Sequence, residues 1–190
     1  RDELGWDVRF AYNKEILGQN GTFGRESYHE IMLLRYFHEA LKKLNPWMND
    51  NQISEAQKIL ENRLSTSSLL QVNEEKYFLI RDGIPVTAKK PNGQTETKKA
   101  AVIDFQNPDN NYFLAVKELK IHGDLYRRRT DIVGFVNGIP LLFVELKKNT
   151  VDVQNAYDDN YTDYQDTIPH LFYYNAFLML SNGTEAKVET

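Results

Sequence analysis

Apolar and polar residues alternate with a period that changes along the chain, and each period predicts a different element. Near the start a two-residue period predicts a strand, and its apolar members are Leu4, Trp6, Val8 and Phe10. From residue 26 to residue 44 the period becomes three to four, which predicts a helix with one face in the core. The apolar positions of this helix are Leu33, Leu34, Phe37, Leu41 and Leu44, and Asn45-Pro46 ends it.

Two more helices are predicted farther along the chain. Ser54 and Gln57 have the spacing of a capping box, which predicts a helix that continues to about residue 64. The polar residues 65–75 follow it as an expected link. A later helix is expected over residues 155–165, and Ile168-Pro169 ends it.

Most of the remaining chain has the composition and turn signals of strands. Asp82-Gly83 is a hairpin signal between expected strands at residues 76–80 and 84–86, whereas residues 89–99 are polar and predict a loop. Further strands are expected at residues 100–105, 112–116, 176–180 and 186–188. Helices followed by strands, a helix and a strand predict an α/β fold, a mixed β-sheet flanked by helices. Residues 1–190 are expected to form a single domain.

Residues 130–148 carry the strongest hairpin signal, because two apolar runs are joined by Asn137-Gly138. Asp131 precedes the first run, and Glu145 and Lys147 lie near the end of the second. Side chains alternate across a strand, so Glu145 and Lys147 are expected on one face and Leu146 on the other. Charged groups on a largely buried sheet cost stability unless they are paired with an opposite charge or take part in binding or catalysis.

Two carboxylates and a lysine at a strand end suit metal-assisted hydrolysis of phosphodiesters. Mg²⁺ takes oxygen ligands, usually one or two carboxylates with water, and the backbone carbonyl of Leu146 could complete the protein ligands. A neighbouring lysine can orient the water or stabilise charge on the phosphate. The pattern alone is also compatible with a structural cross-strand ion pair, which explains many Glu-x-Lys sequences.

The hairpin resembles the nuclease signature of the R subunit of type I restriction enzymes, a branch of the PD-(D/E)xK nucleases. The resemblance lies in Arg129-Thr130-Asp131-Ile132-Val133, Val136-Asn137-Gly138-Ile139-Pro140-Leu141 and Val144-Glu145-Leu146-Lys147. Other stretches resemble the same N-terminal region in the same order, among them Leu44-Asn45-Pro46, Ile103-Asp104, Asn107-Pro108 with Asn111, and Ile168-Pro169-His170-Leu171-Phe172. It implies a restriction-endonuclease-like fold with Asp131 and Glu145 as metal-binding acids and Lys147 as the catalytic lysine.

The resemblance also implies a Gln-x-x-x-Tyr motif on the following helix. Tyr164 matches its tyrosine, but Asn160 replaces the glutamine and shortens the amide arm by one methylene. Thr130 replaces the usual proline before the first acid. Related nucleases often add a helical glutamate to the metal site, and Glu30 is the candidate here; Glu26 is expected to be a first-turn acid favoured by the helix dipole.

Several other polar residues could have either a structural or a functional role. Arg127, Arg128 and Arg129 could be a solvated loop, but at least one is expected to contact phosphate. Asp104 is expected to cap the Asn-Pro turn that follows it. Lys148 is expected to be exposed or structural. The histidines show no ligand spacing and are expected on the surface or in packing positions: His29, His38, His122 and His170.

Composition limits the remaining possibilities. The 190 residues contain no cysteine, which excludes thiol nucleophiles, disulfides and cysteine metal sites. No apolar run approaches a membrane span, there is no signal-peptide pattern, and the cytoplasm is the expected compartment. The formal net charge of −4 argues mildly against unspecific DNA binding by the whole surface. The first residue is Arg1, and the chain is expected to be a piece of a longer protein.

The function expected is that of a Mg²⁺-dependent endonuclease domain acting on double-stranded DNA. The resemblance implies a complex with methylation and specificity subunits and an ATP-driven motor, yet the chain contains no Gly-x-x-x-x-Gly-Lys-Ser/Thr phosphate loop. The chain is therefore expected to be the N-terminal fragment, with ATP needed only by the absent motor. The alternatives are a catalytically silent module that binds DNA or partner subunits, and an unrelated α/β domain with a structural ion network.

Overall fold

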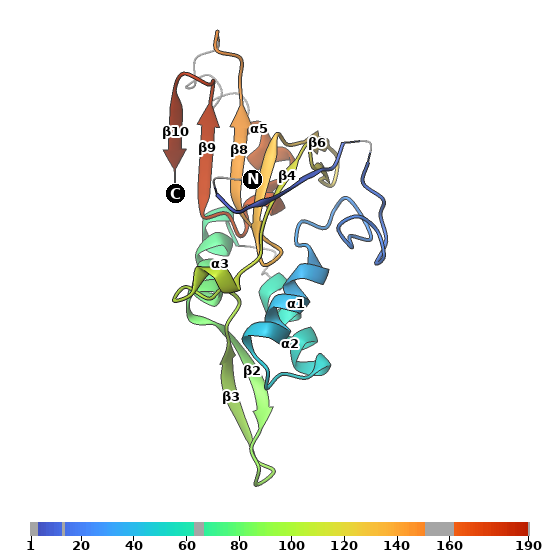
Figure 1. Cartoon of the computed structure of the whole chain (residues 1–190), viewed down its shortest axis with the longest axis vertical. Coiled ribbons are helices and arrows are strands. Elements are labelled where there is room, and N and C mark those ends of the chain that lie inside the picture. The colour runs from blue at the N-terminus through green and yellow to red at the C-terminus, as the bar shows by residue number, and fades with distance from the viewer. Residues whose placement is uncertain (1–3, 13, 63–66, 151–161, 190) are drawn as a thin grey trace.

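The largest element of the fold is a six-stranded mixed sheet with the strand order β1-β4-β7-β8-β9-β10 (Figure 1). The computed structural model describes residues 4–12, 14–62, 67–150 and 162–189. β1 is parallel to β4 and β8 is parallel to β9, whereas the other neighbouring strands are antiparallel. The strands are β1 Asp7–Phe10, β4 Phe113–Lys117, β7 Ile132–Val136, β8 Ile139–Leu146, β9 Phe177–Ser181 and β10 Ala186–Glu189. The α/β architecture with a mixed sheet is confirmed.

Two small antiparallel sheets accompany the large one in the described part of the chain. β2 (Ile84–Lys89) and β3 (Thr95–Ala100) form an arm that projects away from the main sheet (Figure 1). β5 (Lys120–His122) and β6 (Arg127–Arg129) form a short hairpin that leads into β7.

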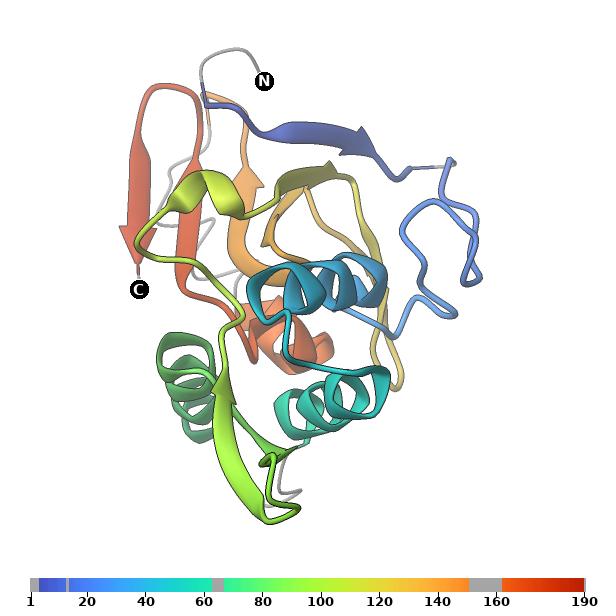
Figure 2. The same cartoon turned by 60° about the horizontal axis from the view of Figure 1, so that its bottom comes forward.

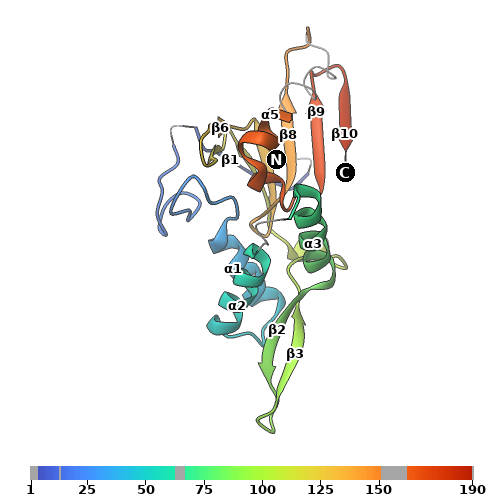
Figure 3. The same ribbon diagram turned by 180° about the vertical axis from the view of Figure 1, so that it is seen from behind.

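Helices lie beside and below the main sheet (Figure 2). They are α1 Leu34–Leu44, α2 Asp50–Glu61, α3 Leu69–Asp82 and α5 Thr162–Thr167, with short 3-10 helices at Pro108–Asn110 and Pro169–Phe172. Seen from behind, α5 lies in front of β8 (Figure 3). Phe143 of β8 packs edge-on against Tyr164 of α5 and against Phe172, with ring centroids 5.5 and 5.3 Å apart. Within the described residues, no helix is long and apolar enough to cross a membrane.

The predicted hairpin around Asn137-Gly138 is confirmed as β7 and β8. Both turn residues have positive φ, 51° at Asn137 and 79° at Gly138, as a tight primed hairpin turn requires. The Gly138 carbonyl accepts a hydrogen bond of 2.9 Å from the Leu33 N–H, and a Cβ at Gly138 would lie 2.4 Å from the Leu33 oxygen. Glycine is therefore required at this turn by its conformation and by the close approach of the chain before α1.

The predicted helix over residues 26–44 is too long, because α1 begins only at Leu34. Several backbone groups before it bond to residues outside the expected helix instead of forming helical turns. Arg25 donates to the Glu30 carbonyl at 2.8 Å, the Tyr28 carbonyl accepts from the His122 N–H at 3.0 Å, and Leu33 bonds Gly138. Its apolar spacing is thus satisfied by tertiary contacts rather than by helical turns. The predicted helix end at Asn45-Pro46 is confirmed.

The second helix begins earlier than predicted, and the third was not predicted at all. Asn49 and Gln52 form the capping box of α2, whereas Ser54 lies inside that helix and donates to the Asp50 carbonyl. The expected link over residues 65–75 and the expected strand at 76–80 were wrong where described, because Leu69–Asp82 is helical. Its buried residues are four apart, the spacing of a helix face, and Gly83 ends it with a φ of 88°.

The predicted loop over residues 89–99 and the predicted strand at 100–105 were also wrong. The turn is confined to residues 90–94, where the Lys90 N–H donates to the Gln94 carbonyl, and β3 then runs from Thr95 to Ala100. Residues 101–105 lie in no strand, and side-chain amides bind backbone groups of this segment. Asn45 bonds both the N–H and the carbonyl of Ala101, and Asn111 bonds both groups of Asp104.

The remaining predicted strands near the two ends are confirmed with small shifts. β1 is an edge strand whose Val8 and Phe10 are exposed rather than buried. β4, β9 and β10 correspond to the strands expected at residues 112–116, 176–180 and 186–188. The helix expected over 155–165 falls largely on residues 155–161, which lie outside the described residues; α5 covers the rest and ends before Ile168-Pro169, as predicted.

Candidate active site

The register of β7 and β8 brings Asp131 to Glu145. Ile132 pairs with Val144 after a one-residue register shift between Gly134 and Phe135, and Asp131 and Glu145 are the next residues outward from this pair. Directly opposed residues of an antiparallel pair project to the same face. The Asp131 carboxylate accepts a hydrogen bond of 2.7 Å from the Leu146 backbone N–H. The first acid is therefore fixed against the strand end that carries the second.

Glu145 and Lys147 share one face, as their spacing predicted. The Lys147 ammonium lies 2.9 Å from the Glu145 carboxylate, and Glu145 is only 4% exposed. Leu146 between them is 47% exposed and points away. The Lys147 N–H donates to the Ser181 carbonyl at 2.8 Å, which holds this end of β8 to β9. The ion pair is thus mounted on a strand supported from both sides.

Tyr164 forms a wall of the same site from α5. Its side chain is 8% exposed, and its hydroxyl donates to the Arg129 carbonyl at 3.4 Å. Burial raises the pKa of Tyr164, and the nearby carboxylates of Glu145 and Asp131 raise it further because they disfavour a phenolate. Tyr164 therefore lies close to both acids and is a neutral phenol at physiological pH. Asn160, its predicted companion, lies outside the described residues.

The donor set of this site consists of two carboxylates with one cation beside them. Among the residues that the structure describes, no group of three or more His, Cys, Asp or Glu side chains is arranged to hold a metal ion. Mg²⁺ does not need such a cage, because it keeps several waters and binds through one or two carboxylates. The residues present therefore fit Mg²⁺ better than a metal ion that is held entirely by protein side chains.

The three arginines of β6 project to different faces of the strand. Arg128 forms a two-pronged ion pair with Asp163 of α5, with both distances 2.8 Å. Arg127 and Arg129 lie on the other face and are exposed. The expectation of a phosphate contact in this run therefore applies to Arg127 and Arg129, because Arg128 is already engaged by a carboxylate.

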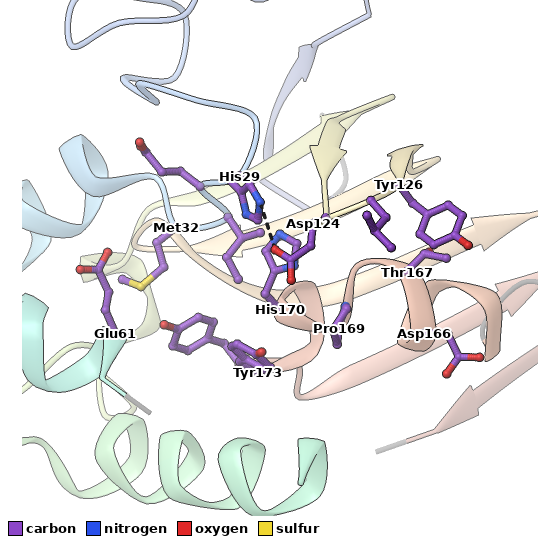
Figure 4. Close-up of a pocket in the computed structure, with 15 residues that line it drawn as sticks. His29, Met32, Glu61, Asp124, Tyr126, Asp166, Thr167, Pro169, His170 and Tyr173 are labelled. Atoms are coloured by element: carbon purple, nitrogen blue, oxygen red, sulfur yellow. Dashed lines mark ion pairs between the residues drawn. The ribbon is translucent and has the colours of Figure 1, made fainter. Parts of the chain in front are cut away.

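Glu30 is not brought to the Asp131 and Glu145 pair. It lies before α1, not on it, and its carboxylate accepts the Glu26 N–H at 3.1 Å. Glu30 lines a cavity of about 470 Å³ (Figure 4). The residues that line this cavity include none of the three predicted catalytic residues: they are His29, Glu30, Ile31, Met32, Glu61, Gly123, Asp124, Leu125, Tyr126, Asp166, Thr167, Pro169, His170, Tyr173 and Tyr174.

Two of the four histidines meet at this cavity. His29 and His170 have ring centroids 5.2 Å apart, and His29 lies 3.6 Å from the Asp124 carboxylate (Figure 4). Asp124 is almost fully exposed, so this ion pair is worth little. The surface and packing roles expected for the histidines agree with this arrangement.

Some supporting residues were predicted and others were missed. Asp104 caps the Asn-Pro turn as expected, accepting from the N–H groups of Gln106 and Asn107, and these bonds together with that of Asn110 lower its pKa. Asp163 was missed, because no local pattern links an acid on α5 to an arginine 35 positions earlier. Thr130 is buried and its N–H donates to the Leu119 carbonyl, a bond that the proline usual at this position could not make.

Comparisons with known proteins identify the family to which the chain is similar. The family model of the type I restriction enzyme R protein N terminus matches residues 1–190. The chain is 32% identical, over 97% of its length, to the type I restriction enzyme HindI endonuclease subunit of Haemophilus influenzae. It is 30% identical, over 86% of its length, to a Methanocaldococcus jannaschii protein assigned as the type I restriction enzyme MjaIXP endonuclease subunit. It covers 17% and 16% of these two relatives, less than a fifth of their length.

Proposed function

The chain belongs to the family of the type I restriction enzyme R protein N terminus, and from this membership we propose that it is a Mg²⁺-dependent DNA endonuclease domain. The single observation that supports the proposal most is the hydrogen bond from the Leu146 N–H to the Asp131 carboxylate. It places one acid beside the Glu145–Lys147 pair at the end of a rigid sheet. Two carboxylates suit a hard metal ion, and a lysine beside them can stabilise charge on a phosphodiester.

Each residue of the site has a distinct proposed role. Asp131 and Glu145 would hold Mg²⁺, and the Leu146 carbonyl would be a further protein ligand. When bound, the metal ion lowers the pKa of a coordinated water and stabilises charge on the phosphate. Lys147 is held by Glu145 and orients the attacking water or contacts the phosphate oxygens. Tyr164 covers one side of the acids and limits the access of water.

The complete protein is proposed to act within a larger assembly. A motor that hydrolyses ATP would deliver double-stranded DNA to this domain, and methylation and specificity subunits would recognise the DNA sequence. A catalytically silent module that binds DNA or partner subunits is the alternative. The presence of Asp131 beside the Glu145–Lys147 pair favours the nuclease over this alternative, because a structural ion pair would need only one of the two acids.

Separate measurements of cleavage and ATP hydrolysis test the proposal. Asp131→Ala and Lys147→Ala are introduced into the R protein that contains this chain, which is then assembled with its partner subunits. We expect both variants to lose plasmid cleavage and to keep ATP hydrolysis. Lys148→Ala is the matched control, because Lys148 is the neighbouring lysine and is exposed. Normal cleavage by Asp131→Ala and Lys147→Ala would contradict the site assignment.

A further inference from the structure

The β5–β6 hairpin has one face that carries cations and one that is built into the protein. Lys120 pairs with Arg129 and His122 pairs with Arg127, so these four side chains project to one face. The intervening pair, Ile121 and Arg128, projects to the other face. There Ile121 is fully buried and Arg128 is bound to Asp163. Ile121 and Arg128 are therefore engaged within the protein, whereas the side chains on the first face are available to contact a ligand.

Two tyrosines lie between the cations of the first face. The Arg129 guanidinium is 4.5 Å from the centre of the Tyr12 ring, and the Lys120 ammonium is 5.7 Å from the same ring. Lys120 is also 5.9 Å from the Tyr28 ring, which packs against His122 at 4.9 Å. Aromatic faces attract cations, so the rings hold like charges side by side. Figures 1 and 3 both place β6 next to the N-terminal β1 segment that leads to Tyr12.

The cations of this face lack carboxylate partners among the described residues. No ion pair joins Lys120, Arg127 or Arg129 to an acid within the described ranges, whereas Arg25 beneath them binds Glu15 at 2.7 Å. Burial lowers the pKa of His122, and the positive charges of Arg127, His29, Arg25 and Lys120 lower it further. A histidine whose charged neighbours are all cations reports a positive local potential.

Backbone hydrogen bonds continue without a break from the β5–β6 hairpin to Asp131. Beyond the Lys120–Arg129 pair, the Thr130 N–H donates to the Leu119 carbonyl at 3.0 Å. The Glu118 N–H then donates to the Asp131 carbonyl at 2.9 Å. Arg129 is two residues from Asp131, and its carbonyl accepts from Tyr164 at the wall of the site. Arg129 on the cationic face is therefore separated from Asp131 by a single residue, Thr130, along a hydrogen-bonded backbone.

We propose that Lys120, Arg127 and Arg129, ordered by Tyr12 and Tyr28, bind the phosphate backbone of duplex DNA beside the cleavage site. The proposal rests on the proposed nuclease function for the choice of DNA as the polymer. Contacts to phosphates position a duplex without reading its sequence. Such contacts suit an acidic protein, because a local cationic face attracts DNA while the net charge of −4 limits binding elsewhere.

The salt dependence of DNA binding tests this surface directly. The 190-residue chain is titrated onto a labelled duplex of random sequence in EDTA, so that no cleavage occurs, at several salt concentrations. The double variant Arg127→Gln/Arg129→Gln is expected to lower the slope of log K against log salt by about 2, since each lost phosphate contact removes about 0.9. Arg128→Gln is the matched control, with expected slope unchanged, because Arg128 lies on the same strand but is bound to Asp163. Urea unfolding verifies that each variant is folded.

The outcomes separate this surface from the catalytic proposal. An unchanged slope in the double variant, or an equal loss in Arg128→Gln, would overturn the surface and leave the catalytic assignment standing. Asp131→Ala is expected to leave the salt dependence of DNA binding unchanged. If this variant still cleaved DNA in the assembled enzyme, only the assignment of Asp131 to the catalytic site would fail. Vesicles of equimolar phosphatidylcholine and phosphatidylserine are expected to bind weakly, and binding to them that exceeds binding to DNA would overturn the choice of polymer.

Discussion

Replacing Lys147 with methionine leaves the Glu145 carboxylate buried without its cation. The two charged groups are 2.9 Å apart, and Glu145 is 4% exposed. At an effective dielectric constant of about 20, charges at this distance attract by about 6 kcal/mol, and desolvation offsets most of that gain. Removing one partner of a fully buried pair costs about 3–5 kcal/mol. The Lys147 side chain is 21% exposed, so we expect Lys147→Met to lower the free energy of unfolding by about 2–3 kcal/mol.

A double-mutant cycle distinguishes this loss from a loss of packing. Glu145→Gln combined with Lys147→Met removes both charges, and we expect the double variant to be at least 1 kcal/mol more stable than Lys147→Met alone. Urea unfolding of the 190-residue chain, followed by circular dichroism, gives the four free energies. Lys148→Met is the control for an exposed lysine and should change stability by less than about 0.5 kcal/mol. If Lys147→Met were no worse than Lys148→Met, or if the double variant were less stable than both single variants, the buried pair would not exist as described.

Three further predictions concern the turn at Gly138, the side chain of Tyr164 and the imidazole of His122. Gly138→Ala should lower the free energy of unfolding in urea by more than about 2 kcal/mol, because the new Cβ would meet the Leu33 oxygen. Gly93→Ala has the same sign of φ but open space around the new Cβ, and it should lower that free energy by about 1 kcal/mol. Tyr164→Phe should lower the free energy of unfolding by less than about 1 kcal/mol, because it loses only a hydrogen bond of 3.4 Å. Tyr164→Ala also loses the packing of the ring and should lower it by about 3–5 kcal/mol. Equal losses in the two variants would contradict the packing role of Tyr164. Because the folded protein lowers the pKa of His122 below 6.5, stability should fall as pH decreases below about 6.5, and His122→Gln should reduce that fall; an unchanged pH dependence between pH 7.5 and 5.5 would refute it.

The sequence was most informative where one local pattern determines a long-range contact. Asn137-Gly138 determines the turn, and the alternation of β8 puts Lys147 on the face of Glu145. The pairing of Ile132 with Val144 does not follow from the turn alone, because the register shifts by one residue between Gly134 and Phe135. A stretch of about twenty residues was therefore enough to predict the hairpin and the Glu145–Lys147 neighbours, but not the register shift that brings Asp131 toward them.

Local patterns failed where distant residues decide the structure of a segment. The apolar period before Leu34 predicts a helix, yet contacts with Arg25, His122 and Gly138 keep that backbone extended or turned. Leu69–Asp82 contains residues typical of strands, but it forms a helix that begins with a capping box at Ser68 and buries every fourth residue from Val72 to Ile80. Glu30 was assigned to the metal site because it continued a predicted helical stripe, and it loses that support once the helix begins at Leu34.

The position of Asp131 depends on backbone donors and acceptors, which explains how the site tolerates change in its signature. The Asp131 carbonyl accepts from Glu118 on one side, and its carboxylate accepts from the Leu146 N–H on the other. Neither bond uses a side-chain donor, so substitutions at Glu118 or Leu146 leave the partners of the acid in place. Thr130 in place of proline adds a third backbone bond, to Leu119. The acid is therefore held by the backbone of residues 118–119, between β4 and β5, and by the end of β8, and changes that shift these segments should disturb it more than changes to its neighbouring side chains.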